Sequence, residues 1–253
     1  MKQRTLGLWA ALALVFLHAP LVVLIIFSFN QSRFTVWQGF SLVWYRAALA
    51  DPQLAEGLWN SLIIAAVAAS LATIIGTLAA YGMWRRPAPL LAGTLYLSLL
   101  TPEIVTGVSL LALFQWSFRF LNLRLGLHTV IAAHVAFSIA YVMIVVSARL
   151  RQYDRSLEEA AMDLGATEWG AFRRITLPYL APAISAAALL ALVASFDDYV
   201  ITSLVSGIDS ETLPMVIYAM AHRGVSPVLN AVSAFIVVIF GSLIVVSQRL
   251  QKA

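Results

Sequence analysis

The sequence predicts an all-α fold: a polytopic membrane bundle of six transmembrane helices, with one polar pair of short helices between the fourth and the fifth. Composition is the first observation, since 61% of the 253 residues are hydrophobic and 11% are charged, against about 25% charged residues in soluble domains. The second is that the apolar residues form six runs, each close to the roughly 20 residues that cross a bilayer as a helix. The third is that charged residues concentrate in one interval, residues 154–178. We therefore expect a single membrane domain over residues 1–253.

The six runs, taken in order, lie at about residues 6–29, 58–83, 89–118, 128–148, 181–204 and 228–246. Between the first two, Ser41 is placed to cap a short helix over 42–49. The nearby side chains of Trp37 and Trp44 are typical of a membrane–water interface. The stretch 206–227 is predicted to be a polar loop.

The second run carries a row of small residues at spacings of four, four, three, four and four: Ser61, Ala65, Ala69, Ala72, Gly76 and Ala80. Small residues on one face let two helices approach closely in lipid. An alanine-rich composition alone would also place alanines here, but the regular spacing favours a packed helix interface.

Acidic groups occur inside the third and fifth runs, where a charge at the bilayer centre costs about 2.5–3.5 kcal/mol on insertion scales. Glu103 follows Pro102, which is expected to break the third helix, as in the interrupted helices that line transport sites. Asp198 continues a face of small residues and should point toward protein, whereas Asp197 is rotated from it by about 100°. That face consists of Ala187, Ala191 and Ala194.

We hypothesise that these three carboxylates help a cationic substrate to pass. Two other interpretations stay open: the carboxylates pair with basic groups of a partner subunit, or Asp197 and Asp198 lie near the outer surface. His134, which shares its helix with Ser138 and Tyr141, is expected to be a packed, hydrogen-bonded residue rather than a ligand.

Residues 154–178 predict two short helices joined by a tight turn. Ser156 and Glu159 have the spacing of a capping box, so the first helix should begin there. Gly165 is placed to end it, because glycine takes the left-handed conformation without steric cost. The apolar face of this helix consists of Leu157, Ala160, Ala161 and Leu164.

Thr167 is placed to cap the second helix, over residues 168–175, and Pro178 should limit how far it runs. The polar face of the pair carries Glu158, Asp163, Arg173 and Arg174.

Basic residues set the orientation of the bundle, since they concentrate in cytoplasmic loops. With the N-terminus inside, 11 of the 16 Lys and Arg residues face the cytoplasm. The remaining five lie outside: Arg33, Arg46, Arg119, Arg124 and Arg223. Both termini and residues 154–178 are then expected on the cytoplasmic side of the membrane.

Three roles are open for residues 154–178: an amphipathic linker on the membrane surface, a DNA-binding helix-turn-helix, and a docking element for a soluble partner. The lipid-embedded flanks argue against DNA. A motif favours docking, because the segment matches E-A-A, three residues, G, nine residues, I-x-L-P at every fixed position. The matching residues are Glu159, Ala160, Ala161, Gly165, Ile175, Leu177 and Pro178. In this EAA motif the chain resembles permease subunits of ATP-binding-cassette importers.

The resemblance covers nearly the whole chain. It is to the MetI-like class of permeases and, within that class, to the second permease subunit of spermidine/putrescine importers. The further matching stretches are residues 27–30, 40–45, 101–107, 196–198 and 212–214. Phe27 and Glu103 stand where Tyr and Asp are the commonest family forms, and both changes are conservative. The candidate substrate-path residues are Glu103, Asp197 and Asp198, with their neighbours Thr101 and Tyr199.

The resemblance implies a pore formed with a second, different permease subunit in membrane lipid. Two ATPase subunits, which hold ATP and magnesium, would grip the EAA helices and meet Glu159 with basic groups. A periplasmic solute-binding protein would deliver the substrate, and no nucleic acid is expected as a partner.

The sequence has no cysteine, no G-x-x-x-x-G-K-[ST] loop, no H-E-x-x-H and no G-x-S-x-G, so we expect a transport subunit without a cofactor of its own rather than an enzyme. Two alternatives stay open: the same architecture importing ferric iron, thiamine or an aminophosphonate, and a membrane receptor or scaffold without transport.

Overall fold

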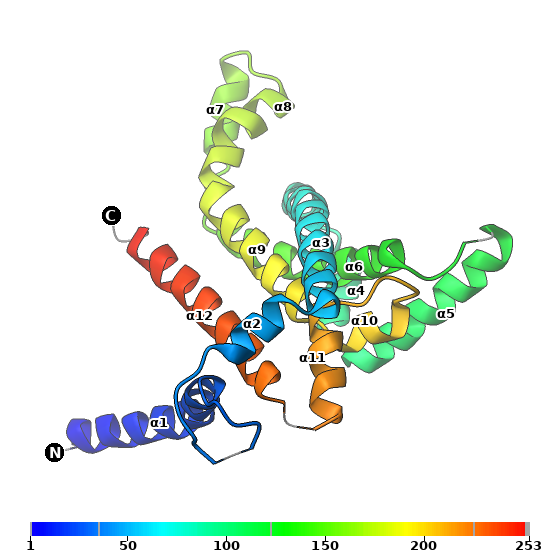
Figure 1. Cartoon of the computed structure of the whole chain (residues 1–253). Coiled ribbons are helices and arrows are strands. Elements are labelled where there is room, and N and C mark those ends of the chain that lie inside the picture. The colour runs from blue at the N-terminus through cyan, green and yellow to red at the C-terminus, as the bar shows by residue number, and fades with distance from the viewer. Residues whose placement is uncertain (1, 35, 122, 225, 251–253) are drawn as a thin grey trace. The chain divides into compact units, whose positions relative to one another are not determined.

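The computed structural model describes residues 2–34, 36–121, 123–224 and 226–250, and within them every regular element is a helix (Figure 1). It divides into two compact units, one of residues 1–55 with 216–253 and one of residues 56–215. The predicted all-α class is confirmed. The only β-type pairing in the described residues is an isolated bridge between Asn30 and Phe40.

The first unit contains α1 (Lys2–Ser28), α2 (Val43–Leu49) and α12 (Pro227–Leu250), and α12 packs against both of the others. The loop after α1 is held by Asn30, whose carbonyl oxygen accepts from the Trp44 indole N–H at 2.8 Å. The Ser28 and Tyr45 hydroxyls lie 2.7 Å apart. Ser41 accepts from the Val43 N–H at 3.2 Å, so α2 begins one residue later than its sequence predicts. The indole of Trp44 therefore stabilises the loop, besides any role at the membrane interface.

The second unit is built around α6 (Leu127–Leu150), which packs extensively against α9 (Leu177–Asp197). α3 (Pro52–Arg85) enters this unit with its small-residue row facing inward. All six residues of the row are buried. A Cβ at Gly76 would lie 2.8 Å from Val142 of α6, so the predicted close helix interface is confirmed.

The third apolar run is two helices, α4 (Pro89–Leu100) and α5 (Glu103–Leu121), which are bent by 113° at the Thr101–Pro102 break. The predicted break at Pro102 is confirmed. The fifth run also breaks, which was not predicted: α9 ends at Asp197, and a short α10 (Val200–Val205) follows. The stretch 206–227 was wrongly expected to be a loop throughout, since it contains α11 (Leu213–His222).

By length and composition, four helical stretches among the described residues can each cross a membrane, and the bent α4–α5 pair would be a fifth. α12 counts as a shorter apolar helix over Pro227–Ile239. The six spans therefore stay a prediction.

Candidate functional site

A cavity of about 390 Å³ opens in the second unit between the two broken helices. The candidate path residues Thr101, Glu103, Asp197, Asp198 and Tyr199 all line it. The sequence places them in two runs almost a hundred residues apart, and the fold gathers them because both runs break at this level. The remaining lining includes aromatic and small side chains, among them Phe137, Tyr141 and Ala194.

The three carboxylates of this cavity have different surroundings. Asp198 is nearly buried, with 7% of its side chain exposed, as its place on the small-residue face predicts. Asp197 and Glu103 are exposed. The carboxylates of Asp197 and Glu103 can therefore face a charged solute, whereas the Asp198 carboxylate makes contacts within the protein.

Asp198 stabilises the break that ends α9. Its carboxylate accepts from the backbone N–H and from the hydroxyl of Thr202, each at 2.7 Å, and so caps the start of α10. His134 lies 3.4 Å from the same carboxylate oxygen. No proline or glycine lies at this break, so Asp198 supplies the local hydrogen bonds that a continuous helix would have made.

His134 is fully buried on α6 and holds the break from the other side. Its ring nitrogens lie 2.7 Å from the Ser195 hydroxyl and 2.9 Å from the Thr202 hydroxyl. The prediction of a packed, hydrogen-bonded histidine is confirmed, and its partners come from α9 and α10.

Residues 154–178 form the second candidate site. α7 (Ser156–Asp163) is followed by a turn, and then by α8 (Glu168–Ala171) and a π turn, η1 (Phe172–Thr176), which leads into α9. Figure 1 shows α7 and α8 at the end of α9 opposite to α10. The two sites therefore lie at opposite ends of α9.

Gly165 makes the turn after α7 with φ +91°, the left-handed conformation expected of it. Its N–H donates to the Met162 carbonyl at 2.9 Å, and the Ala166 N–H donates to the Ala161 carbonyl at 3.0 Å, which is the Schellman arrangement. Thr167 then accepts from the Gly170 N–H at 3.1 Å and caps α8, as predicted.

Two local predictions for this segment are wrong. Asp154, rather than a Ser156–Glu159 box, caps α7 by accepting from the Ser156 N–H at 3.0 Å, and this bond holds the pKa of Asp154 below its usual range. Pro178 does not limit the helix. It follows the wider π turn and lies in the first turn of α9, where a missing N–H costs little.

The predicted faces of α7 are wrong in part: Asp163 is exposed as expected, but the burial of Glu158 and of the leucines is not as predicted. Glu158, assigned to the polar face, is buried with 1% exposure, whereas Leu157 is 48% and Leu164 is 90% exposed. Glu159 is exposed, and within the described part of the chain its ion pair is a local one, with Arg155 at 3.3 Å. The apolar residues and Glu159 therefore form an outward surface, while the neighbouring carboxylate points into the protein.

Glu158 accepts from the Tyr81 hydroxyl at 3.1 Å and from the Thr176 hydroxyl, and its other oxygen lies 3.4 Å from the Arg85 guanidinium. The Tyr153 and Thr176 hydroxyls are 3.1 Å apart. Burial raises the pKa of the Tyr153 hydroxyl, which keeps it protonated as a donor. This network was not predicted, because Glu158 and Glu159 look alike in the sequence. A basic residue, Arg85, at the end of the second apolar run was the available signal.

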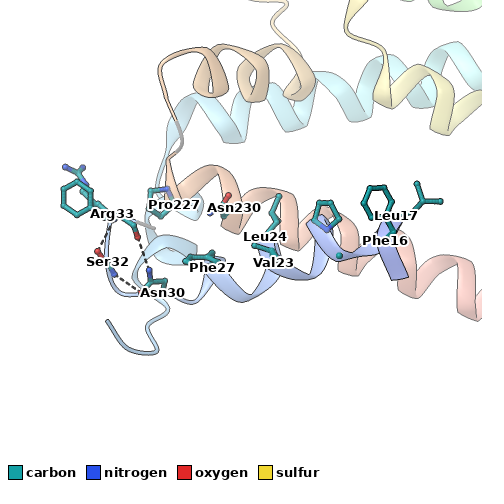
Figure 2. A pocket seen from close by; sticks show the side chains of 13 residues that line it. Phe16, Leu17, Val23, Leu24, Phe27, Asn30, Ser32, Arg33, Pro227 and Asn230 are labelled. Carbon is teal, nitrogen blue, oxygen red and sulfur yellow. Dashed lines mark hydrogen bonds between the residues drawn. The ribbon is translucent and has the colours of Figure 1, made fainter. Parts of the chain in front are cut away.

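The first unit holds a larger cavity, of about 860 Å³, along α1 (Figure 2). Its walls are mainly apolar, with Phe16, Leu24 and Phe27 from α1 and Pro227 from α12, and Arg33 lies at its polar end. Among the residues that the structure describes, no acidic side chain lines it. Of the two cavities, the smaller one in the second unit has the chemistry expected for a cation.

Comparisons with known proteins identify the family of this chain. Residues 72–253 match the family described as "Binding-protein-dependent transport system inner membrane component". The chain is 36% identical over 241 residues to the "Spermidine/putrescine transport system permease protein PotC" of Escherichia coli K12, covering 94% of this chain and 90% of that one. It is 44% identical over 232 residues to the "Putrescine transport system permease protein PotI" of the same organism, covering 89% and 83%.

Solved structures share the fold at low sequence identity. A bacterial ABC transporter that imports the acidic polysaccharide alginate has a chain with a TM-score of 0.72 and 16% identity, covering 100% of this chain and 97% of that one. The MetNI methionine ABC transporter gives a TM-score of 0.61 and 20% identity, covering 78% and 94%. The family match and the relatives together show that this chain belongs to the inner-membrane components of binding-protein-dependent transport systems.

Proposed function

We propose that this chain is a permease subunit of an ATP-binding-cassette importer, and that it carries polyamines such as putrescine or spermidine across the bacterial inner membrane. The observation that carries the choice of substrate is the pair of exposed carboxylates, Glu103 and Asp197, in one cavity of about 390 Å³. Relatives named as polyamine permeases support the same choice.

A polyamine is an extended cation with apolar methylene groups between its amines. In the proposed path, Glu103 and Asp197 attract the amines, and Tyr199 and the aromatic side chains Phe137 and Tyr141 line the same cavity. Thr101, at the break between α4 and α5, adds a hydroxyl. Asp198 serves the path indirectly, by holding the break at which Asp197 and Tyr199 lie.

ATP binding drives the cycle from outside this chain. In the proposed assembly, one of two ATPase subunits docks on the surface of this chain formed by Glu159, Leu157 and Leu164. Gly165, Ile175, Leu177 and Pro178 shape that segment, with Ala160 and Ala161 in its first helix. A 100-fold bias between inward-open and outward-open states needs about 2.7 kcal/mol of differential binding, which closure of two ATPases can supply.

The remaining partners are a second permease subunit, which completes the pore, and a periplasmic solute-binding protein, which delivers the substrate. Both termini and residues 154–178 lie in the cytoplasm in this proposal. The excess of basic residues on that side supports the orientation.

Uptake of labelled putrescine and spermidine by cells that express the complete transporter tests the proposal. We expect Glu103→Gln and Asp197→Asn each to raise the concentration for half-maximal uptake about 10- to 150-fold, since a hydrogen bond to a charged group contributes about 1.5–3 kcal/mol. Glu56→Gln is the matched control, because Glu56 is an exposed carboxylate outside the cavity. Uptake unchanged in both cavity variants at equal expression would refute the path.

Competition with unlabelled solutes separates polyamines from the other solutes that this architecture could import. Excess spermidine should abolish uptake of labelled putrescine, whereas thiamine, ferric iron and an aminophosphonate should leave it unchanged. Competition by one of these three solutes and not by spermidine would contradict the choice of polyamines as substrate, but it would not contradict the proposed importer architecture.

A further inference from the structure

We infer that Glu158 is a positioning residue: it locks the docking helices to the spans, so that the pull of an ATPase on α7 reaches α3 and α9. This inference rests on the proposed function, in which residues 154–178 dock onto an ATPase. It assigns different tasks to two adjacent glutamates. Glu159 faces outward to the partner, and Glu158 faces inward to the bundle.

The contacts of Glu158 come from three residues on two elements, α3 and the π turn η1. Tyr81 on α3 donates its hydroxyl to the carboxylate, at 3.1 Å from each oxygen. Arg85, one turn further along α3, approaches the same carboxylate at 3.4 Å. Thr176 donates its hydroxyl from the π turn that leads into α9. One carboxylate thus joins the first docking helix to two spans.

A buried carboxylate is costly unless it is paired and hydrogen-bonded. Glu158 is 1% exposed, and its partners satisfy both of its oxygens. The network forms only where α7 lies against these partners. If α7 moved away, the Glu158 carboxylate would be left buried without partners or would have to move into water. Of the acidic groups in residues 154–178, Glu158 alone is buried.

Arg85 extends the lock to the second docking helix. Its guanidinium also pairs with Glu168 of α8 at 3.3 Å. Thr176 has a single proton, which it donates to Glu158, so Tyr153 donates to Thr176 at 3.1 Å. The chain of polar contacts therefore includes the loop between α6 and α7.

Aromatic side chains pack along the same contacts. Phe172 of the π turn lies 4.5 Å from the ring of Tyr81 and 5.2 Å from that of Trp169, between ring centroids. Tyr153 lies 5.6 Å from Trp84 of α3 and 4.9 Å from Tyr179 of α9. These ring contacts add packing between the docking segment and both spans.

Distances between two spin labels test the lock directly. The chain has no cysteine, so cysteines introduced at Asp163 of α7 and at Arg86 after α3, both exposed, are the only labelling sites. We expect one narrow distance distribution in the unaltered background and a broadened one with Glu158→Gln, which removes the charge and keeps one acceptor oxygen. Glu159→Gln is the matched control and should leave the distribution narrow.

Tyr81→Phe is a second variant that leaves the carboxylate in place and removes one hydroxyl that bonds it. We expect a smaller broadening than with Glu158→Gln. Tyr81→Phe decides the matter if Glu158→Gln does not accumulate in the membrane. Distributions as narrow as the unaltered one in both variants would overturn the inference.

Transport separates a positioning role from a merely structural one. With Glu158→Gln, we expect uptake to fall about tenfold, a typical size for a residue between coupled sites, while the amount in the membrane and co-purification of the ATPase stay unchanged. Loss of co-purification with Glu158→Gln would contradict the inference. Retained co-purification with Glu159→Gln would instead contradict the proposed docking, and the label distances would still decide the role of Glu158.

Discussion

Replacing Gly165 with alanine should uncouple the transporter through the backbone alone. Gly165 has φ +91°, and a Cβ added there would meet nothing within 4 Å, so the substitution brings conformational strain without a clash. Left-handed backbone costs an L-residue about 1–2 kcal/mol, which lowers the equilibrium constant for forming the intact turn about 5- to 30-fold. We expect binding of the ATPase to weaken by up to this factor, in proportion to the loss of the intact turn, measured by titrating ATPase onto purified permease.

Two further substitutions separate strain from bulk. Gly82→Ala also adds a methyl group to open space, but in the helical backbone of α3, and should leave ATPase binding unchanged. Gly165→Asn adds a larger side chain that tolerates the left-handed region, and should weaken binding less than Gly165→Ala does. Binding that weakens with side-chain size instead, or equally with Gly82→Ala, would refute the reasoning. Gly165→Asp should leave the protein inserted in the membrane but uncoupled, because it adds a charge to the docking surface.

Two other predictions concern stability and pH. A Cβ at Gly207 would lie 1.9 Å from the backbone oxygen of Leu125, so Gly207→Ala should cost about 1–3 kcal/mol and lower the thermal unfolding midpoint in detergent; an unchanged midpoint would contradict this packing. The pKa of Asp154 is lowered by the Ser156 N–H, so its cap stabilises α7 at pH values above the ordinary carboxyl pKa, and this contribution is lost as the pH falls through the lowered value. In acid, amide hydrogen exchange in α7 should then accelerate relative to exchange in the Asp154→Asn variant, whose cap does not titrate. Equal exchange rates in the two proteins would contradict a stabilising cap at Asp154.

Periodicity and turn chemistry predicted much of the fold. The small-residue row on α3 is buried at all six positions, because its spacing alone fixes one helix face. Pro102 breaks the third run and Gly165 takes a positive φ, since these residues restrict or free the backbone wherever they occur. The acidic residues of the third and fifth runs line one cavity, as expected of charges that avoid lipid.

Some failures depend on tertiary contacts, and others on local geometry that periodicity does not reveal. The break after Asp197 is stabilised by Asp198 and by His134 from another helix, and no proline or glycine marks it. Glu158 is buried because Arg85 and Tyr81 lie opposite, and a sequence pattern cannot separate it from Glu159. The π turn before Pro178 lets a helix continue through a proline that was expected to limit it.

The sidedness of residues 154–178 tests most directly whether this permease is driven from the cytoplasm. Leu164, which is 90% exposed, can be replaced by the only cysteine of the chain and treated with a membrane-impermeant maleimide. The account predicts labelling in inside-out vesicles and none in intact spheroplasts. Labelling in intact spheroplasts would place the docking segment outside the cell, beyond the reach of any ATPase, and would contradict the account.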